Sequence, residues 1–162
     1  MTVFEKVFRE LNKTSVKYLV IGGVAVNLHG YARFTGDLDL LLLLNKENLA
    51  RIDKVMKRLK YSERLPVSIM ELGDIKKVQK WIKEKNLKAY TFNPPPGNLL
   101  QIDIIINESL KFAQFYKRKL IKTMGKLKIP VVSINDIIEM KKRAKRDKDI
   151  MDLKVLEYLS GI

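Results

Sequence analysis

Two aspartates separated by a single residue, Asp37 and Asp39, have the residue type and spacing of a metal-binding or catalytic site. They open the apolar run Leu38–Leu44, which is typical of a strand, and side chains two apart on a strand point to the same face of a sheet. Two like charges side by side against an apolar strand are costly unless a cation lies between them. The pair therefore predicts oxygen ligands for a hard divalent cation such as Mg²⁺. The alternative is a solvated pair at the start of the strand.

A third aspartate, Asp103, lies in the middle of the apolar run Leu99–Ile106. An acidic residue in such a run is rare without a partner. That partner is either a lysine or arginine in a structural ion pair, or a metal ion shared with Asp37 and Asp39. In the second case, three carboxylates from two strands can hold two metal ions about 3.5–4 Å apart, an arrangement that activates an attacking oxygen and stabilises a leaving phosphate.

A pair of glycines, Gly22 and Gly23, separates a predicted strand from a predicted helix. Glycine lets the backbone approach a ligand closely, and the N–H groups at the start of a helix favour a phosphate. The alternative is that the two glycines simply make a tight turn between the two elements.

The segments that position these residues alternate between strand and helix patterns, which predicts an α/β or α+β fold. Thr2 and Ser133 are predicted as helix N-caps. Strands are predicted at Tyr18–Ile21, Leu38–Leu44, Pro66–Glu71, Lys88–Phe92, Leu99–Ile106 and Leu127–Val132. Helices are predicted at Val3–Asn12, Val24–Leu28, Glu47–Lys60, Ile75–Glu84, after Ser133, and at Asp149–Leu159.

Composition narrows the class of protein. A chain of 162 residues, 46% of them hydrophobic, is expected to form one domain and is not a disordered sequence. The absence of cysteine excludes disulfides, cysteine-ligated zinc, iron–sulfur clusters and thiol nucleophiles, and the single histidine, His29, excludes a multi-histidine metal site. There is no apolar run long enough to span a membrane and no signal-peptide pattern, so we expect a cytoplasmic protein without a membrane partner.

The net charge of +14 is unevenly distributed along the chain. Residues 1–50 carry +1, whereas residues 51–100 and 101–150 carry +7 each. A charge of this size favours polyanionic partners, namely nucleic acid, nucleotides or an anionic surface.

Taken together, the motifs resemble those of the DNA polymerase β-like nucleotidyltransferase superfamily. The superfamily combines an apolar residue followed by Gly-Gly or Gly-Ser, then Asp-x-Asp, then a third acid on a nearby strand. The stretch Arg33-Phe-Thr-Gly-Asp-Leu-Asp39 is similar to a branch that contains minimal nucleotidyltransferases, AbiE-type toxins and lincosamide-type nucleotidyltransferases. The C-terminal stretch Lys148-Asp-Ile-Met-Asp-Leu153 matches a pattern that is frequent in the last helix of that branch.

This resemblance implies a fold and a domain organisation. We expect a nucleotidyltransferase fold with a small, twisted, mixed sheet flanked by helices. Residues 1–132 would form the catalytic core and residues 133–162 a C-terminal helical extension of the same single domain.

The resemblance also implies roles for individual residues. Asp37, Asp39 and Asp103 would be catalytic residues that bind Mg²⁺ or Mn²⁺, with Asp103 as the base near the acceptor hydroxyl. Five further residues would bind the nucleoside triphosphate, and two would be accessory acids. Gly23 would contact the triphosphate through its backbone alone. The nucleotide-binding set is Gly22, Gly23, Arg33, Thr35 and Lys141, and the accessory acids are Asp149 and Asp152. Arg33 and Thr35 also fit a solvated loop, Lys141 a solvated helix face, and the two accessory acids ordinary helix charges.

The implied reaction is Mg²⁺-dependent transfer of a nucleotidyl group from a nucleoside triphosphate to an acceptor hydroxyl. The excess of positive charge favours RNA, in particular tRNA, as the acceptor over a small antibiotic-like molecule. The competing hypothesis is a non-catalytic module that keeps the fold, either a nucleic-acid-binding protein or one that pairs with a cognate toxin or antitoxin.

Overall fold

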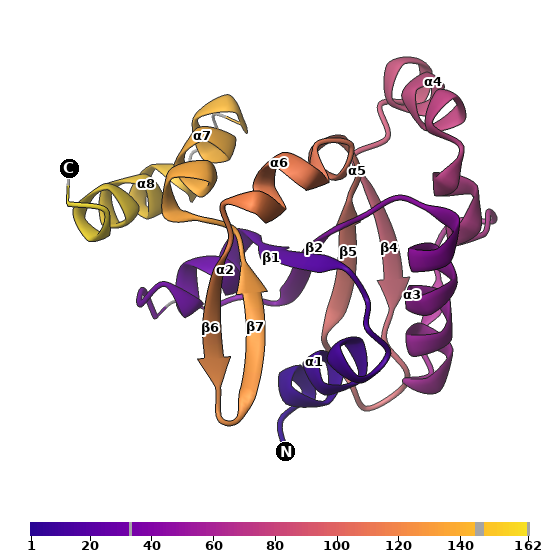
Figure 1. The fold of residues 1–162 in the computed structure, drawn as a ribbon, viewed down its shortest axis with the longest axis horizontal. Helices are drawn as coiled ribbons and strands as arrows, with labels where there is room; N and C mark the ends of the chain where they lie inside the picture. The colour runs from indigo at the N-terminus through magenta and orange to yellow at the C-terminus, as the bar shows by residue number, and fades with distance from the viewer. Residues whose placement is uncertain (33, 145–147, 162) are drawn as a thin grey trace.

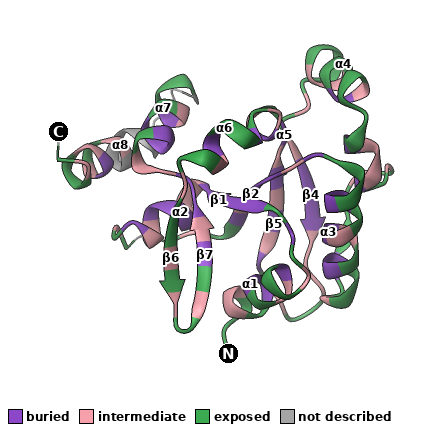
Figure 2. Ribbon diagram, viewed as in Figure 1, coloured by how far each residue is buried: buried purple, intermediate pink, exposed green. Residues whose placement is uncertain are grey.

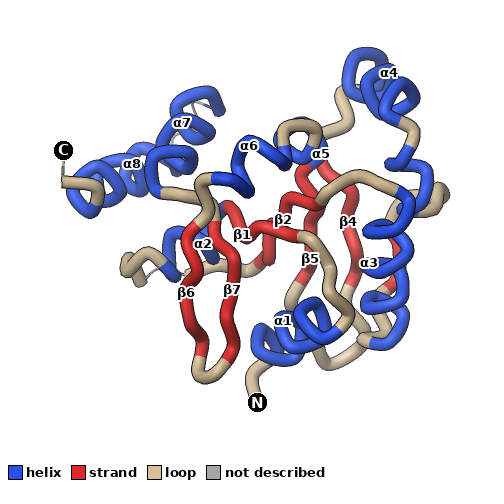
Figure 3. The backbone as a smooth tube through the Cα atoms, viewed as in Figure 1, coloured by secondary structure: helices blue, strands red, loops and turns tan. Residues whose placement is uncertain are grey.

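The chain is built around a mixed sheet of seven strands in the order β3-β4-β5-β2-β1-β7-β6. The computed structural model describes residues 1–32, 34–144 and 148–161, without the side chains of residues 144 and 148–152. Helices cover the sheet, and the helical pair α7 and α8 lies at the end of the molecule opposite α4 (Figures 1 and 3). The predicted α/β nucleotidyltransferase-like fold, with a twisted mixed sheet flanked by helices, is confirmed.

The strands are β1 (Tyr18–Ile21), β2 (Asp37–Leu42), β3 (Ser62–Glu63), β4 (Ala89–Asn93), β5 (Gln101–Ile105), β6 (Leu120–Met124) and β7 (Leu127–Val131). The helices are α1 (Val3–Lys13), α2 (Gly22–Leu28), α3 (Lys46–Arg58), the 3₁₀ helix η1 (Ile69–Gly73), α4 (Ile75–Lys85), α5 (Ile106–Ser109), α6 (Phe112–Lys117), α7 (Ile134–Ala144) and α8 (Lys148–Leu159).

One face of the sheet is apolar along its inner strands β1, β2 and β5, and α1 and α3 pack on this side (Figure 1). Leu38, Leu40 and Leu42 of β2 have no exposed surface (Figure 2). The ring of Tyr18, which lies opposite Leu42 in the antiparallel β1–β2 pair, stacks on Phe8 of α1 with centroids 6.2 Å apart. Because successive side chains alternate between faces, the residues between these leucines point to the other face, where the acidic residues lie.

Polar side chains set the starts of the helices as predicted for two of them. The Thr2 hydroxyl accepts a hydrogen bond from the Glu5 N–H at 3.1 Å, and the Ser133 hydroxyl accepts one from the Asp136 N–H at 3.1 Å. Each satisfies an N–H group that the first turn of a helix leaves without a partner.

The prediction of a strand at Pro66–Glu71 is wrong. Its last three residues belong to η1, whose N-cap Ser68 accepts a hydrogen bond from the Met70 N–H at 3.1 Å. Ile69 and Leu72, three residues apart, are both fully buried, which is helical rather than strand spacing. The strand here is the two-residue β3, which precedes the predicted segment.

Many of the other predicted boundaries differ from the structure by one or two residues. Helix α2 begins at Gly22, two residues before the predicted start. Ile106, predicted as the end of a strand, opens α5 instead. Residues 107–126, which the sequence analysis left unassigned, contain α6 and β6, and β6 pairs with β7 as a hairpin.

In the part of the chain that the structure describes, no helix combines the length and apolarity needed to cross a bilayer.

The buried amide of Asn48 joins the ends of two strands to α3. Its Oδ1 accepts from the Lys17 N–H at 2.7 Å, and its Nδ2 donates to the Lys17 and Leu43 carbonyls, each at 2.9 Å. The side chain therefore satisfies three backbone groups at the edge where β1 begins and β2 ends.

We expect Asn48→Ala to lower the free energy of unfolding by about 2–3 kcal/mol, because it removes the partner of the Lys17 N–H and of the Leu43 carbonyl. The Lys17 carbonyl keeps its hydrogen bond from the Leu43 N–H at 3.3 Å. Urea unfolding measures the change, with Asn107→Ala at an exposed asparagine as the control, expected within about 0.5 kcal/mol of wild type. A loss below 1 kcal/mol for Asn48→Ala would contradict this account.

Candidate active site

The three aspartates predicted from sequence lie on one face of two neighbouring strands. β2 and β5 run parallel, with Asp39 opposite Asp103 and Asp37 opposite Gln101. Asp37 is exposed, and Asp39 and Asp103 are half-buried. Neighbouring strands lie about 4.8 Å apart, so the register places the Asp39 and Asp103 backbones side by side.

Gly22 lies directly against Asp39. In the antiparallel β1–β2 pair Ile21 is opposite Asp39, so the chain enters α2 beside the carboxylate. Gly22 has φ +67°, and a Cβ atom added there would overlap Asp39 Oδ2. Glycine is therefore required twice at this position, for its backbone conformation and for the space that the carboxylate occupies.

Asp103 is held by neutral side chains. Its Oδ1 accepts a hydrogen bond from the Thr91 hydroxyl at 2.7 Å. Gln101 Nε2 lies 3.1 Å from both carboxylate oxygens and donates to them. Of the two partners that the sequence left open for Asp103, the ion pair is not found: among the described residues, no lysine or arginine pairs with this carboxylate.

A second layer fixes the orientation of Gln101. The Arg64 guanidinium donates to Gln101 Oε1 at 2.6 Å and to Asn93 Oδ1 at 2.7 and 3.0 Å. With its oxygen facing Arg64, the Gln101 amide presents its NH₂ group to Asp103. The sequence analysis missed this network. Gln101 carried a signal, since it lies two residues before Asp103 on the same strand, but Thr91 and Arg64 reach the site only through strand pairing.

The donor set fits a hard divalent cation, because it consists of carboxylate oxygens on one face, with Asp39 held in a close backbone cradle. As the side chains stand, however, no group of three or more acidic or histidine residues in the described part of the chain is close enough to hold a metal ion. The Asp103 carboxylate points to Thr91 and Gln101 instead. The three-carboxylate metal site thus stays a prediction.

The other predicted site residues are placed as follows. The Thr35 hydroxyl donates to the Asp37 carbonyl at 3.1 Å and so shapes the start of β2. Gly23 is the second residue of α2, and Lys141 is buried in α7. Arg33 and the side chains of Asp149 and Asp152 lie outside the described residues.

His29 has a structural position near the same edge. Its Nε2 donates to the Val132 carbonyl at 2.8 Å, which links the end of α2 to the end of β7. Burial lowers the pKa of the imidazole, so the ring is neutral at neutral pH. Its Nδ1 is buried with no partner among the described residues.

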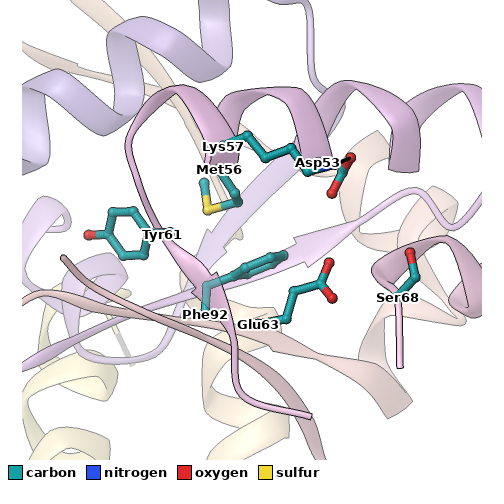
Figure 4. A pocket seen from close by; sticks show the side chains of 7 residues that line it. All are labelled: Asp53, Met56, Lys57, Tyr61, Glu63, Ser68 and Phe92. Carbon is teal, nitrogen blue, oxygen red and sulfur yellow. Dashed lines mark hydrogen bonds and ion pairs between the residues drawn. The ribbon is translucent and has the colours of Figure 1, made fainter. Parts of the chain in front are cut away.

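A cavity of about 340 Å³ lies away from the acids, between α3 and the strands β3 and β4 (Figure 4). Phe92 forms part of its wall and follows Thr91, so it points to the face of the sheet opposite Asp103. The polar lining is partly self-paired, since Lys57 Nζ lies 2.8 Å from Asp53 Oδ2. This cavity is therefore not part of the acidic site.

A mixed sheet with paired acids on the strands after a Gly-Gly turn defines a nucleotidyltransferase-type fold, as the sequence motifs predicted. Residues 1–160 match the family described as "Nucleotidyltransferase of unknown function (DUF6036)". The chain belongs to this family, and it is a nucleotidyltransferase of the DNA polymerase β-like superfamily.

Solved structures share the fold at low sequence identity. The lincosamide antibiotic adenylyltransferase LnuA, lincomycin-bound, has a TM-score of 0.63 and 13% identity, covering 96% of this chain and 95% of LnuA. ANT(2″)-Ia in complex with adenylyl-2″-tobramycin has a TM-score of 0.63 and 12% identity, with 96% and 86% covered. An antigenic nucleotidyltransferase-like protein from Paracoccidioides brasiliensis has a TM-score of 0.59 and 17% identity, with 98% and 78% covered. No curated protein matches the sequence.

The contact between Gly22 and Asp39 can be tested with a matched pair of glycines. We expect Gly22→Ala to destabilise the protein more than Gly125→Ala, which also has a positive φ (+60°) but no atom within 4 Å of an added Cβ. The backbone conformation costs about 1 kcal/mol in both variants, and only Gly22→Ala must also displace Asp39. Urea unfolding of the two variants measures the difference, and equal losses would contradict the contact.

Proposed function

We propose that the protein transfers a nucleoside monophosphate from a nucleoside triphosphate to an acceptor hydroxyl, with Mg²⁺ or Mn²⁺ as cofactor. The observation that carries this proposal is the register of Asp39 with Asp103 beside the Gly22 turn. It brings two carboxylates and the half-buried Gly22–Gly23 turn together, an arrangement that suits the transfer of a phosphate group.

Each group has a role in the proposed reaction. The backbone of Gly22 and Gly23 contacts the triphosphate, and Asp103 accepts the proton of the acceptor hydroxyl. The acceptor oxygen forms a bond to the α-phosphorus, and the bond from that phosphorus to pyrophosphate breaks. Thr91 and Gln101 act as positioning residues, because their hydrogen bonds hold the Asp103 carboxylate in one orientation.

Asp37, Asp39 and Asp103 would hold the metal ion, which neutralises charge on the phosphates when bound. The roles of Arg33, Thr35 and Lys141 in binding phosphates, and of Asp149 and Asp152 as accessory acids, belong to the same proposal. We also propose that residues 1–132 and 133–162 work as one unit, since Ile137 of α7 and Leu156 of α8 join the same hydrophobic core as the sheet.

RNA, in particular tRNA, is the proposed acceptor. The net charge of +14 exceeds what a triphosphate pocket needs and suits a polyanion. A small molecule is the second candidate, and the specific observation in its favour is the similarity of fold to LnuA and ANT(2″)-Ia, whose solved complexes contain antibiotics. A non-catalytic partner of a toxin or antitoxin is the third.

The proposed function is tested by incubating the protein with each of the four labelled nucleoside triphosphates and Mg²⁺. Cellular RNA, aminoglycoside and lincosamide antibiotics, and cellular protein serve as separate acceptors. Label in the RNA fraction supports the first candidate, and label in an antibiotic supports the second. No transfer from any triphosphate to any fraction would overturn the catalytic proposal and favour the non-catalytic module.

We expect Asp39→Asn to reduce transfer by at least a hundredfold while the fold remains intact, because the amide is nearly isosteric but lacks the negative charge. Transfer rates are compared with Glu84→Gln, which removes an equal charge at an exposed position on α4 and is expected to be fully active. Circular dichroism and urea unfolding establish that both variants are folded. Wild-type rates for Asp39→Asn would exclude the proposed site.

A further inference from the structure

A groove of about 520 Å³ lies at the end of β1 opposite the acidic site. Lys17 precedes β1 and lines the groove, whereas Gly22 follows β1 and lies against Asp39. Lys17 and Gly22 are five residues apart across β1, which separates them by about 17 Å of extended chain. A phosphate bound in this groove is therefore not the phosphate that reacts beside Asp39.

The lining of this groove is basic. Four cationic side chains contribute to it, and none of the residues that line it is acidic: the cations are Lys17, Arg51, Lys119 and Lys128. Arg51 is already paired with Glu47 at 2.7 Å. For the three lysines, the described part of the chain provides no carboxylate at ion-pair distance. The groove thus keeps an excess of positive charge.

Two of these lysines converge on one aromatic ring. Lys119 Nζ lies 4.0 Å from the centroid of the Tyr116 ring and Lys17 Nζ lies 5.7 Å from it, so the two ammonium groups are within about 10 Å of each other. The ring is held in place by stacking on Phe112, with centroids 5.0 Å apart. The two ammonium groups therefore place two positive charges beside one aromatic ring in the groove.

The groove also offers apolar surface beside its charges. Ile121 is 51% exposed, and the Tyr116 ring is half-buried. Hydrogen bonds join three of the residues that line the groove. The Tyr18 hydroxyl donates to Asn12 Oδ1 at 2.8 Å, and Asn12 Nδ2 donates to the Lys128 carbonyl at 2.9 Å. Proteins bind single-stranded nucleic acid with a basic groove that follows the sugar–phosphate backbone and with aromatic side chains that contact the bases. The lysines and Tyr116 of this groove provide both kinds of contact.

We propose that this groove binds a single-stranded segment of RNA, with Lys17, Lys119 and Lys128 on its phosphates and Tyr116 and Ile121 against its sugars or bases. This deepens the proposed function and rests on it for one point only, namely that the bound RNA is the acceptor. An acceptor held in the groove would have to span at least the length of β1 to reach the acids. A small acceptor has no use for this second contact.

The test is the binding of a fluorescently labelled single-stranded RNA oligonucleotide, followed by anisotropy over a salt series. Wild type should show a logarithm of affinity that falls steeply with the logarithm of salt concentration. The double variant Lys17→Gln/Lys119→Gln should bind at least tenfold more weakly and lose about 1.4 from the slope, because each single-strand phosphate contact contributes about 0.7.

The matched control is Lys76→Gln/Lys80→Gln, which removes the same charge from exposed positions on α4, at the far end of the molecule (Figure 1). It should bind RNA like wild type. Equal weakening by both double variants would show a general charge effect and overturn the groove, as would the absence of RNA binding by wild type. Tighter binding to vesicles of anionic phospholipid than to RNA would also overturn it, in favour of a membrane surface.

The same experiment separates this inference from the proposed function. If RNA binds through the groove but receives no label in the transfer assay, the groove stands and the RNA-acceptor proposal fails. If an antibiotic is labelled and the groove variants bind RNA like wild type, the transferase stands and the groove fails.

Discussion

Asp39 reaches back against Gly22 because β1 and β2 are antiparallel neighbours and Ile21 lies opposite Asp39. The turn from β1 into α2 has to pass within contact distance of the carboxylate, which only a glycine backbone with φ +67° does here. Both features follow from one register, and shifting β2 by one residue would move Asp39 to the apolar face. The position of the acidic site therefore depends on the pairing of two buried strands.

The two faces of the sheet make that register strict. Leu38 and Leu40 are fully buried on the face that α1 and α3 cover, so β2 cannot slip without exposing them. The intervening Asp37 and Asp39 are consequently held on the more open face. β5 repeats the pattern: Ile102 and Ile104 are buried on one side, and Asp103 lies between them on the other. Hydrophobic burial thus fixes where the carboxylates are, and hydrogen bonds from Thr91 and Gln101 fix how Asp103 is oriented.

Period-two alternation explains why sequence predicted this part of the molecule well. The patterns Leu-Asp-Leu in β2 and Ile-Asp-Ile in β5 predict that the leucines and isoleucines are buried on one face. They also predict that the aspartates lie together on the other face. The strand prediction for residues 66–71 was wrong although Val67 and Ile69 are two residues apart, because Ile69 is buried together with Leu72, three residues on, which is a helical spacing. The β6–β7 hairpin was half missed because β6 is an exposed edge strand, whose pattern of mostly exposed residues carries little hydrophobic signal.

The hydrogen-bond partners of Asp103 and Gln101 could not be predicted from the sequence, for a different reason. Thr91 meets Asp103 through the pairing of β4 with β5, and Arg64, which follows β3, meets Gln101 through the pairing of β3 with β4. No local spacing encodes which residue of one strand faces which residue of another. For the same reason, the sequence showed the excess of lysines but did not predict that Lys17 and Lys119 both lie beside Tyr116. The two lysines are about a hundred residues apart in the chain.

β1 links the two places at which chemistry and binding are proposed. All four of its residues are buried, and Asn48 fixes the backbone of Lys17 at one end while the contact between Gly22 and Asp39 fixes the other. The spacing between the basic groove and the acids is thus set by a rigid strand rather than by a loop. An acceptor that uses both proposed contacts would have to span at least the length of β1, which suits a polymer better than a small molecule.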